Sequence, residues 1–204
     1  MATRTNKSLS AFKSALVGGG ARPNLFEVEL TTFPDEIKEA WGTEGANIFA
    51  FMCKSAALPA SNIAQIDVPF RGRIFKVAGD RTVDTWTVTV INDENFGLRY
   101  AFEAWVELMA RLENNIGATN PTSYMSNATV YQLGRGKEAQ SKTNKGSSNI
   151  ILAQYNFLHI FPTNVSQIDL SYDNGDQIEE FTVEFQVNSW NRGELSEPDE
   201  ETDD

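Results

Sequence analysis

The chain has 204 residues, 41% of them apolar, which is enough to bury the core of one large domain or of two small ones. Its net charge of −11 argues against a nucleic-acid-binding protein, because affinity for phosphates comes largely from Lys and Arg. A single cysteine, Cys53, excludes an internal disulfide and a multi-cysteine metal site and fits a reducing cytoplasm, and no apolar run is long enough to span a bilayer.

The N-terminal region changes its hydrophobic period twice. Residues 1–17 place Leu9, Phe12 and Leu16 at helical spacing, so we expect a short amphipathic helix that needs a partner surface, followed by a glycine linker at 18–20. Residues 21–30 alternate, with apolar Phe26, Val28 and Leu30 opposite Glu27 and Glu29, which predicts a strand with one wet face. Residues 33–46 contain one proline and two glycines and read as a loop excursion.

Two further strands are expected before the middle of the chain. Residues 47–55 are apolar on both alternating faces, which favours a central strand covered on both sides. Another strand runs from Ile63 to Val68 and is interrupted by Pro69 and Gly72 before residues 74–77. That interruption is typical of an edge, a bulge or a projecting loop.

The most organised stretch is residues 69–112. Trp86, Val88 and Val90 alternate with threonines, so we expect a half-buried strand that ends at Asn92. Asp93 is then expected to cap a long helix over about 93–112. The apolar face of this helix is formed by residues at spacings of three and four, namely Leu98, Phe102, Trp105, Met109 and Leu112.

The last part of the chain again predicts strands. A loop at 113–127 leads to a strand marked by Val130 and Leu133, and residues 134–148 form a long loop with four bases and one acid. A strand from Ile150 to Phe161 should end at Pro162. A hairpin is then expected in which Asn174-Gly175 separate two alternating runs, Ile168, Leu170, Tyr172 and Phe181, Val183, Phe185, Val187.

About eight strands and one helix predict a mainly β fold, a β-sandwich of two packed antiparallel sheets with one flanking α-helix. We divide the chain into an N-terminal arm at 1–20, a β domain at 21–190 and an acidic tail at 191–204. The tail has seven acids and one base, so we expect it to be disordered.

Candidate chemistry is sparse. The single histidine, His159, lies mid-strand and is interpreted as a structural or interface residue, and Cys53 as a packing residue. The run Gly134-Arg135-Gly136-Lys137 lacks the spacing, the Ser or Thr and the following helix of a phosphate loop. Glu180 and Glu184, in a polar row on the last strand, could hold a cation or form a solvated face, and the second reading is favoured. We therefore predict no catalytic, cofactor-binding or metal-binding residues.

Four segments in the same order carry a family resemblance, residues 21–30, 51–61, 76–94 and 161–185. The most specific part is AGDRT followed by D-x-W-T-V-T-V-x-N-D, and Pro162-Thr163-Asn164-Val165 adds to it. The chain thereby resembles the tail tube proteins of T-even-type contractile bacteriophages over roughly residues 21–190. It departs from them at 1–20, 33–46, 134–148 and in the acidic tail.

The resemblance implies a structural virion protein, not an enzyme, made in the host cytoplasm and placed in the virion tail. It implies a β-sandwich tube subunit, six of which close into a ring, with rings stacking into a hollow tube that passes DNA and the tape-measure protein without binding DNA specifically. Further partners would be the sheath protein and the baseplate initiator. Alternatives are a tube-initiating baseplate adaptor, a type VI secretion-like tube protein and, remotely, a carbohydrate-binding β-sandwich using the loop residue Trp41.

Two hypotheses about surfaces follow from this resemblance. We expect the lumen to be lined by acidic residues, Glu27, Glu29, Glu180 and Glu184, since negative charge would keep passing DNA from sticking. We expect ring-to-ring contacts from the N-terminal arm and from 69–82, with the contact residues Leu9, Phe12, Leu16, Phe70, Arg71, Arg73, Asp80 and Arg81.

Overall fold

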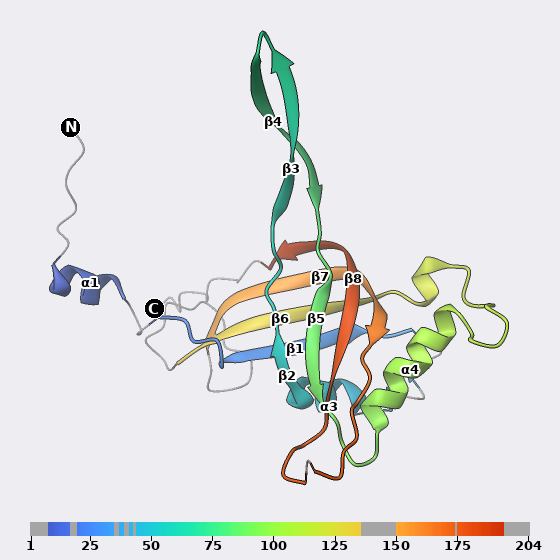
Figure 1. Ribbon diagram of the computed structural model, residues 1–204. Helices are drawn as coiled ribbons and strands as arrows, with labels where there is room; N and C mark the ends of the chain where they lie inside the picture. The colour runs from blue at the N-terminus through green and yellow to red at the C-terminus, as the bar shows by residue number, and fades with distance from the viewer. Residues whose placement is uncertain are drawn as a thin grey trace, which may run out of the picture. The chain divides into compact units, whose positions relative to one another are not determined.

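The computed structural model describes residues 8–16, 20–34, 37–38, 41–42, 44–135, 150–173 and 175–193 (Figure 1). The helices are α1 (Leu9–Ala15), α3 (Gly45–Met52), α4 (Gly97–Met109) and the 3₁₀ helix η2 (Pro121–Ser123). The strands are β1 (Phe26–Thr32), β2 (Cys53–Ala56), β3 (Asn62–Phe70), β4 (Arg73–Thr82), β5 (Trp86–Ile91), β6 (Ser126–Gly134), β7 (Ile150–Val165) and β8 (Glu180–Arg192). Most of the expected basic loop at 134–148, from residue 136 onward, and most of the expected acidic tail at 191–204, from residue 194 onward, lie outside the described residues.

The strands form two sheets, which confirms the predicted mainly β class with two antiparallel sheets. The larger has six strands in the order β1-β6-β7-β8-β5-β2, and the smaller is the β3–β4 hairpin. Antiparallel pairing joins β2 to β5, β5 to β8 and β3 to β4. The smaller sheet is not a buried layer, since every residue of β3 and all of β4 except half-buried Gly79 are exposed.

The chain divides into two compact units. The first unit contains residues 1–27, 130–154 and 192–204, and the second contains 28–129 and 155–191. Within the first unit the backbone amide of Leu133 donates to the Leu25 carbonyl at 2.8 Å, and the Gln132 side chain donates to the Arg22 and Leu25 carbonyls. The second unit holds α3, α4, β5 and the hairpin, and the candidate surfaces below lie mainly in it.

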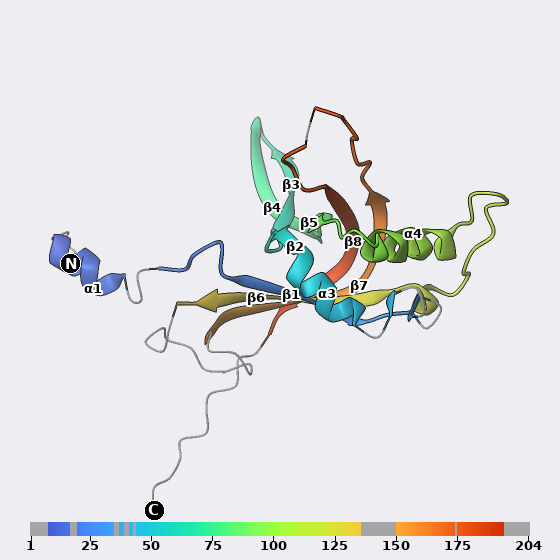
Figure 2. The ribbon, with the colours of Figure 1, turned by 90° about the horizontal axis from the view of Figure 1, so that it is seen from below.

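The core of the second unit is aromatic and joins α4 to β8, whose ribbons lie side by side in Figure 2. Phe102 and Trp105 of α4 are fully buried, and Phe185 of β8 lies 6.0 Å and 6.1 Å from their rings, measured between centroids. The Trp105 indole donates to the Tyr124 carbonyl at 2.7 Å, so its polar edge is satisfied. The predicted apolar face is thus confirmed at Leu98, Phe102 and Trp105.

The bounds of α4 differ from the prediction. The helix spans Gly97–Met109 instead of about 93–112, and Leu112 is 94% exposed beyond its end. Asp93 is not the N-cap, because its carbonyl accepts from the Phe96 amide and closes a turn first. Phe96, in the left-handed region at φ 55, precedes the helix without a side-chain cap.

The strand predicted over 47–55 is wrong for most of its length. Residues 45–52 form α3, and the strand β2 begins only at Cys53, which pairs with Val90 of β5. An apolar run of this length fits a helix or a strand equally well. Tertiary contacts decide in favour of the helix, because Phe49 packs 5.8 Å from Phe102 of α4.

The excursion predicted at 33–46 contributes described residues to the core, so the interpretation as a surface loop is wrong at these positions. Ile37 and Trp41 are buried, and the Trp41 ring lies 4.5 Å from Phe33 and 5.2 Å from Phe102. Trp41 is therefore not an exposed aromatic for a sugar, because its ring is covered by this cluster.

The expected hairpin at 168–187 is only half right. β8 begins at Glu180 with the predicted alternation, but residues 166–173 and 175–179 contain no strand, and Leu170 and Tyr172 are exposed. β7 instead continues through Pro162 to Val165. The Asn-Gly signal could not set the register, because the first run has no buried face to hold it.

Candidate functional surfaces

The polar face of β8 is the first candidate surface. Phe181, Val183, Phe185 and Val187 are buried, while the residues between them are half-buried or exposed. The register pairs Glu184 with Thr87 of β5 and Thr182 with Thr89, so the row continues across both strands. The structure thus places Glu180 and Glu184 on the face opposite the aromatic core, because side chains alternate along a strand.

One of the acidic side chains in this row, Glu180, is paired with a base. Lys54 of β2 forms an ion pair with Glu180, with Nζ to Oε1 at 2.5 Å, and both side chains are substantially exposed. An exposed pair of this kind contributes about 0–1 kcal/mol. On β1, Glu27 and Glu29 are half-buried and alternate with buried Val28 and Leu30.

The β3–β4 hairpin is the second candidate surface. Its register runs from Asn62 opposite Thr82 to Phe70 opposite Arg73, with an irregularity between Ile63 and Gln65. Arg71 and Gly72 close it at φ 45 and φ 82, the double positive φ of a tight hairpin turn. The interruption seen in the sequence is therefore the tip of a projecting hairpin (Figure 1).

The hairpin is apolar yet exposed. Phe70 and Phe75 are each 66% exposed, and the Arg71 guanidinium lies 5.4 Å from the Phe70 ring centroid. Apolar side chains exposed on both strands are Ile63, Ile66, Val68, Phe70, Ile74, Phe75 and Val77. Large exposed apolar patches are rare on soluble monomers and mark interaction sites.

The base of the hairpin is fastened to the larger sheet. The Arg81 guanidinium lies 4.6 Å from the Trp190 ring centroid, and the Tyr155 ring centroid lies 6.0 Å from the same Trp190 ring. Asn62 donates to Asp84 at 2.6 Å on the other side. Sequence reasoning selected Arg81 but missed Trp190 and Tyr155 as its support, since cation–π contacts across strands leave no local pattern. Asp80 is exposed on β4.

Helix α1 in the first unit is the third candidate. The predicted helix is confirmed over Leu9–Ala15, and the Ser8 side chain caps it by accepting from the Ala11 amide. Leu9, Phe12 and Leu16 are all exposed, and the helix buries no residue. A helix of seven residues is marginal by itself, so this face needs a covering surface.

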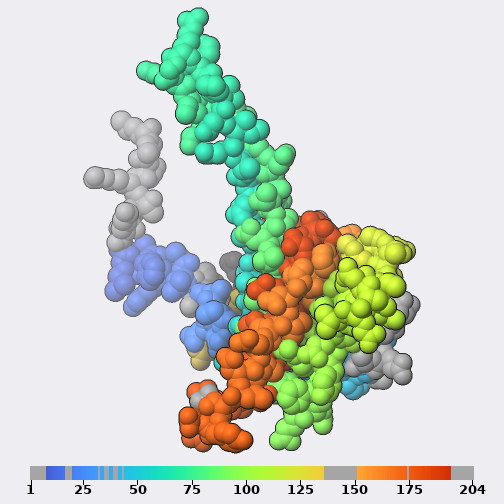
Figure 3. Space-filling view, turned by 45° about the vertical axis from the view of Figure 1, so that its right-hand side comes forward, coloured from blue at the N-terminus to red at the C-terminus, as the bar shows by residue number. Residues whose placement is uncertain are grey.

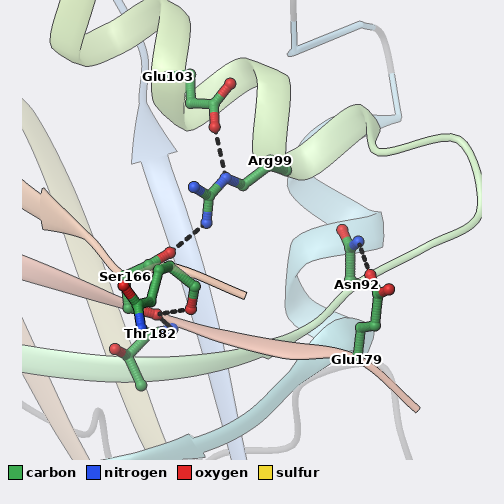
Figure 4. Close-up of polar contacts among 7 residues, drawn as sticks. Asn92, Arg99, Glu103, Ser166, Glu179 and Thr182 are labelled. Carbon is green, nitrogen blue, oxygen red and sulfur yellow. Dashed lines mark hydrogen bonds and ion pairs between the residues drawn. The ribbon is translucent and has the colours of Figure 1, made fainter. Parts of the chain in front are cut away.

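Residues 166–173 and 175–179 lie in the connection from β7 to β8, and hydrogen bonds hold both of its ends (Figure 4). At the start, Arg99 of α4 donates to the Ser166 carbonyl and to Glu103 at 2.6 Å, and the Ser166 hydroxyl accepts from the Thr182 amide at 2.9 Å. At the end, the Asn92 side chain donates to Glu179 at 3.0 Å. Its described residues line a groove of about 1000 Å³ beside Lys54 and Glu180.

The groove was not foreseen from the sequence. Leu170, Tyr172 and Ile178 are exposed around it, whereas the alternation had placed Leu170 and Tyr172 in a strand. The available signal was the concentration of acids at 167–180, namely Asp169, Asp173, Asp176, Glu179 and Glu180, without any base.

Catalytic and metal chemistry finds no support in the described part of the chain. No group of three or more His, Cys, Asp or Glu side chains there could hold a metal ion, and no described helix is long and apolar enough to cross a membrane. Burial raises the pKa of the Cys53 thiol to about 12, so it is protonated and unreactive at neutral pH. His159 lies at an irregular point of β7 with φ 54, where its amide donates to Asn127 and its carbonyl accepts from Asn188.

Comparisons with known proteins agree on one family. The sequence model of the family described as phage tail tube protein matches residues 21–193. The tail tube protein gp19 of Enterobacteria phage T4 is 36% identical over 180 residues, which cover 88% of this chain and 94% of that protein. The tail tube protein of Serratia phage KSP90 is 24% identical, with 87% and 93% covered.

Solved structures support the fold. A chain in the anti-feeding prophage cap, a tube-terminating cap, superposes with a TM-score of 0.55 at 15% identity, covering 85% of this chain and 91% of that one. A chain in the sheath–tube complex of an extracellular contractile injection system, in its extended state, gives a TM-score of 0.52 at 13% identity, covering 92% and 99%. The predicted resemblance is thereby confirmed: the chain belongs to the phage tail tube protein family and is a structural protein of the virion tail rather than an enzyme.

Proposed function

We propose that six copies of this chain close into a ring and that rings stack into the hollow inner tube of a contractile tail. The observation that carries this proposal is the β3–β4 hairpin, whose apolar side chains are exposed on both strands while a complete aromatic core lies elsewhere. A folded unit with spare apolar surface of this kind can bury it against identical copies. The tube is a conduit for DNA and the tape-measure protein.

Open sheet edges support ring closure. The larger sheet ends at β1 on one side and at β2 on the other. Unpaired edge strands are templates for pairing with another chain, and closure of a sheet into a continuous barrel removes them. Contacts between different surfaces of neighbouring copies are heterologous, and stacking with a rotation that does not close yields an open helical polymer.

The polar row of β8 is the proposed lumen face. It lies opposite the aromatic core and carries Glu180 and Glu184, and the acidic residues Glu27 and Glu29 of β1 belong to the same proposal. Negative charge facing a channel repels the phosphates of passing DNA and prevents adhesion. A map of the assembled tube with all four side chains away from the channel would refute this assignment.

Ring-to-ring contact is proposed for α1 and the hairpin. The residues assigned to it are exposed, namely Leu9, Phe12, Leu16, Phe70, Arg71, Arg73, Asp80 and Arg81. Deletion of residues 2–17 should leave single rings but impair stacking, which sedimentation velocity resolves. Tubes of unaltered length would show that the N-terminal arm does not contribute to the ring-to-ring contact.

The sheath protein outside the tube, the tape-measure protein inside it and a baseplate initiator at its end are the proposed partners. The carbohydrate-binding alternative loses its basis, since Trp41, Trp86 and Trp105 are buried and Trp190 is covered by Arg81.

Negative-stain microscopy of the purified full-length protein at high concentration tests the proposal. We expect smooth hollow rods with a regular axial repeat. A protein that remains monomeric at every concentration and salt condition, alone or with a preformed baseplate, would refute it.

A further inference from the structure

We propose that the tip of the β3–β4 hairpin of one copy docks in the groove under residues 166–179 of a copy in the next ring. This inference rests on the proposed stacking of rings and adds the site that receives the hairpin. The tip is defined as residues 70–76, and the receiving loop as residues 167–173 and 175–180.

The two surfaces lie at opposite ends of the second unit (Figure 3). β4 leads into β5 at Trp86, so the hairpin leaves from that end of the strand. The other end of β5, Ile91, pairs with Glu180, the residue at which the receiving loop ends. The six-residue strand β5 separates the base of the hairpin from the receiving loop by about 17 Å, at roughly 3.4 Å per residue, and the tip lies at the far end of the hairpin. A donor and a receiver at opposite ends of one strand suit head-to-tail stacking.

The charges of the two surfaces are complementary. The hairpin tip carries Arg71, Arg73 and Lys76 and no acid, while the receiving loop carries five acids and no base. Lys54 is the one base among the residues that line the groove, and it is paired with Glu180. Complementary potentials of this kind guide encounter and fix register, and like-charge juxtaposition costs several kcal/mol.

The apolar surfaces also match. The tip exposes Phe70, Ile74 and Phe75, each at 63% or more, and the receiving loop exposes Leu170, Tyr172 and Ile178, each at 72% or more. Neither set is covered within the second unit, and both ends of the loop are fastened, at Ser166 and at Glu179. A groove of about 1000 Å³ is large enough to receive several side chains. Docking would bury both apolar sets at once.

Crosslinking in assembled tubes tests the contact. The double variant Lys76→Cys with Ser171→Cys places one thiol on each surface and keeps the apolar side chains of both, and a flexible bis-maleimide tolerates separations beyond disulfide reach. Because each copy carries a donor and a receiver, crosslinked tubes should give a ladder of covalent multimers on a denaturing gel. Cys53 does not interfere at neutral pH, since burial raises its pKa to about 12. The matched control is Lys76→Cys with Leu112→Cys, whose second site is 94% exposed beyond α4 and should give no ladder.

Charge reversal provides an independent test. Arg71→Glu with Arg73→Glu, and separately Asp169→Lys with Asp173→Lys, should each reduce the pelletable tube fraction about tenfold or more, and combining them should restore most of it. Pairing the arginine reversals with Glu107→Lys and Glu113→Lys, two exposed acids outside the loop, should not rescue assembly. Wild-type tubes with neither ladder nor rescue would overturn this inference and leave the tube function standing. Failure of the wild type to form tubes would overturn the function itself.

Discussion

The aromatic core under α4 and the β3–β4 hairpin use the same kinds of residue with opposite outcomes. Phe102 and Trp105 are fully buried against β8, whereas Phe70 and Phe75 are each 66% exposed. Both regions have the patterns of regular secondary structure, so local propensity does not separate them. What separates them is whether this chain supplies the covering surface, and for the hairpin it does not.

The difference implies a division of labour. The core stabilises the single copy, since burial of large aromatic side chains dominates the free energy of folding. The hairpin contributes little, because an isolated two-stranded ribbon is marginally stable in water. Its fixed points are at its base, where Arg81 stacks on Trp190 and Asn62 donates to Asp84. Four predictions probe this division, ordered from the largest effect on the single copy to the smallest.

Trp105→Ala should produce the largest loss on the core side. The residue is fully buried and its indole donates to the Tyr124 carbonyl, so truncation leaves a cavity and an unpaired acceptor. We expect the free energy of unfolding of the single copy to fall by about 3–5 kcal/mol, measured by urea denaturation. A loss below about 1 kcal/mol would show that the α4 face is not the core of this protein.

The reactivity of the Cys53 thiol measures how well the core of the single copy is buried. Burial raises its pKa from the ordinary 9.0 to about 12, so between these values the unfolded thiol is ionised and the folded thiol is protonated. At pH 8 the folded protein should react with a maleimide about 1000-fold more slowly than the denatured chain, and the rate should keep rising with pH toward 12. A folded rate that levels off near pH 9 would contradict this burial.

Arg99→Ala should have a moderate effect. The guanidinium joins α4 to the receiving loop through the Ser166 carbonyl and lies 5.3 Å from the Phe181 ring centroid. Its loss should lower the free energy of unfolding by about 1–2 kcal/mol. Glu103→Gln is the matched control, because the Glu103 carboxylate is 49% exposed and its i,i+4 pair with Arg99 should contribute less than about 0.5 kcal/mol. Equal losses would show that Arg99 acts through Glu103 alone.

Phe75→Ser should leave the single copy almost unchanged and abolish assembly. The side chain is 66% exposed on β4, so the free energy of unfolding should change by less than about 0.5 kcal/mol. The tube fraction recovered by sedimentation should nevertheless collapse, whereas Leu112→Ser, at a still more exposed apolar residue outside the hairpin, should assemble normally. Normal tubes from Phe75→Ser would show that the exposed apolar side chains of the hairpin are not needed for assembly, which contradicts the proposed difference between the two regions.

Strict alternation made some elements predictable from sequence. β5 and β8 follow it residue by residue, because one face is buried and the other is wet. Residues 47–52 were not predictable, since their apolar run has no period that distinguishes helix from strand, and the contact of Phe49 with Phe102 decides. The hairpin was readable as a projecting loop, since Pro69 and Gly72 interrupt the pattern.

Partners distant in sequence were the parts that could not be foreseen. Trp190 covers Arg81 from more than a hundred residues away, and Trp41 is buried by Phe33 and Phe102 from what the sequence presents as a loop. The receiving groove was hidden because Leu170 and Tyr172 mimic a strand. Only the tertiary arrangement shows that they have no partner strand and are exposed.

A reconstruction of the assembled tube by electron cryomicroscopy tests the central claim most directly, because it shows what covers the hairpin. We predict density of a neighbouring ring against Phe70 and Phe75. A hairpin that stands free in solvent, with the rings in contact through other surfaces, would contradict the account.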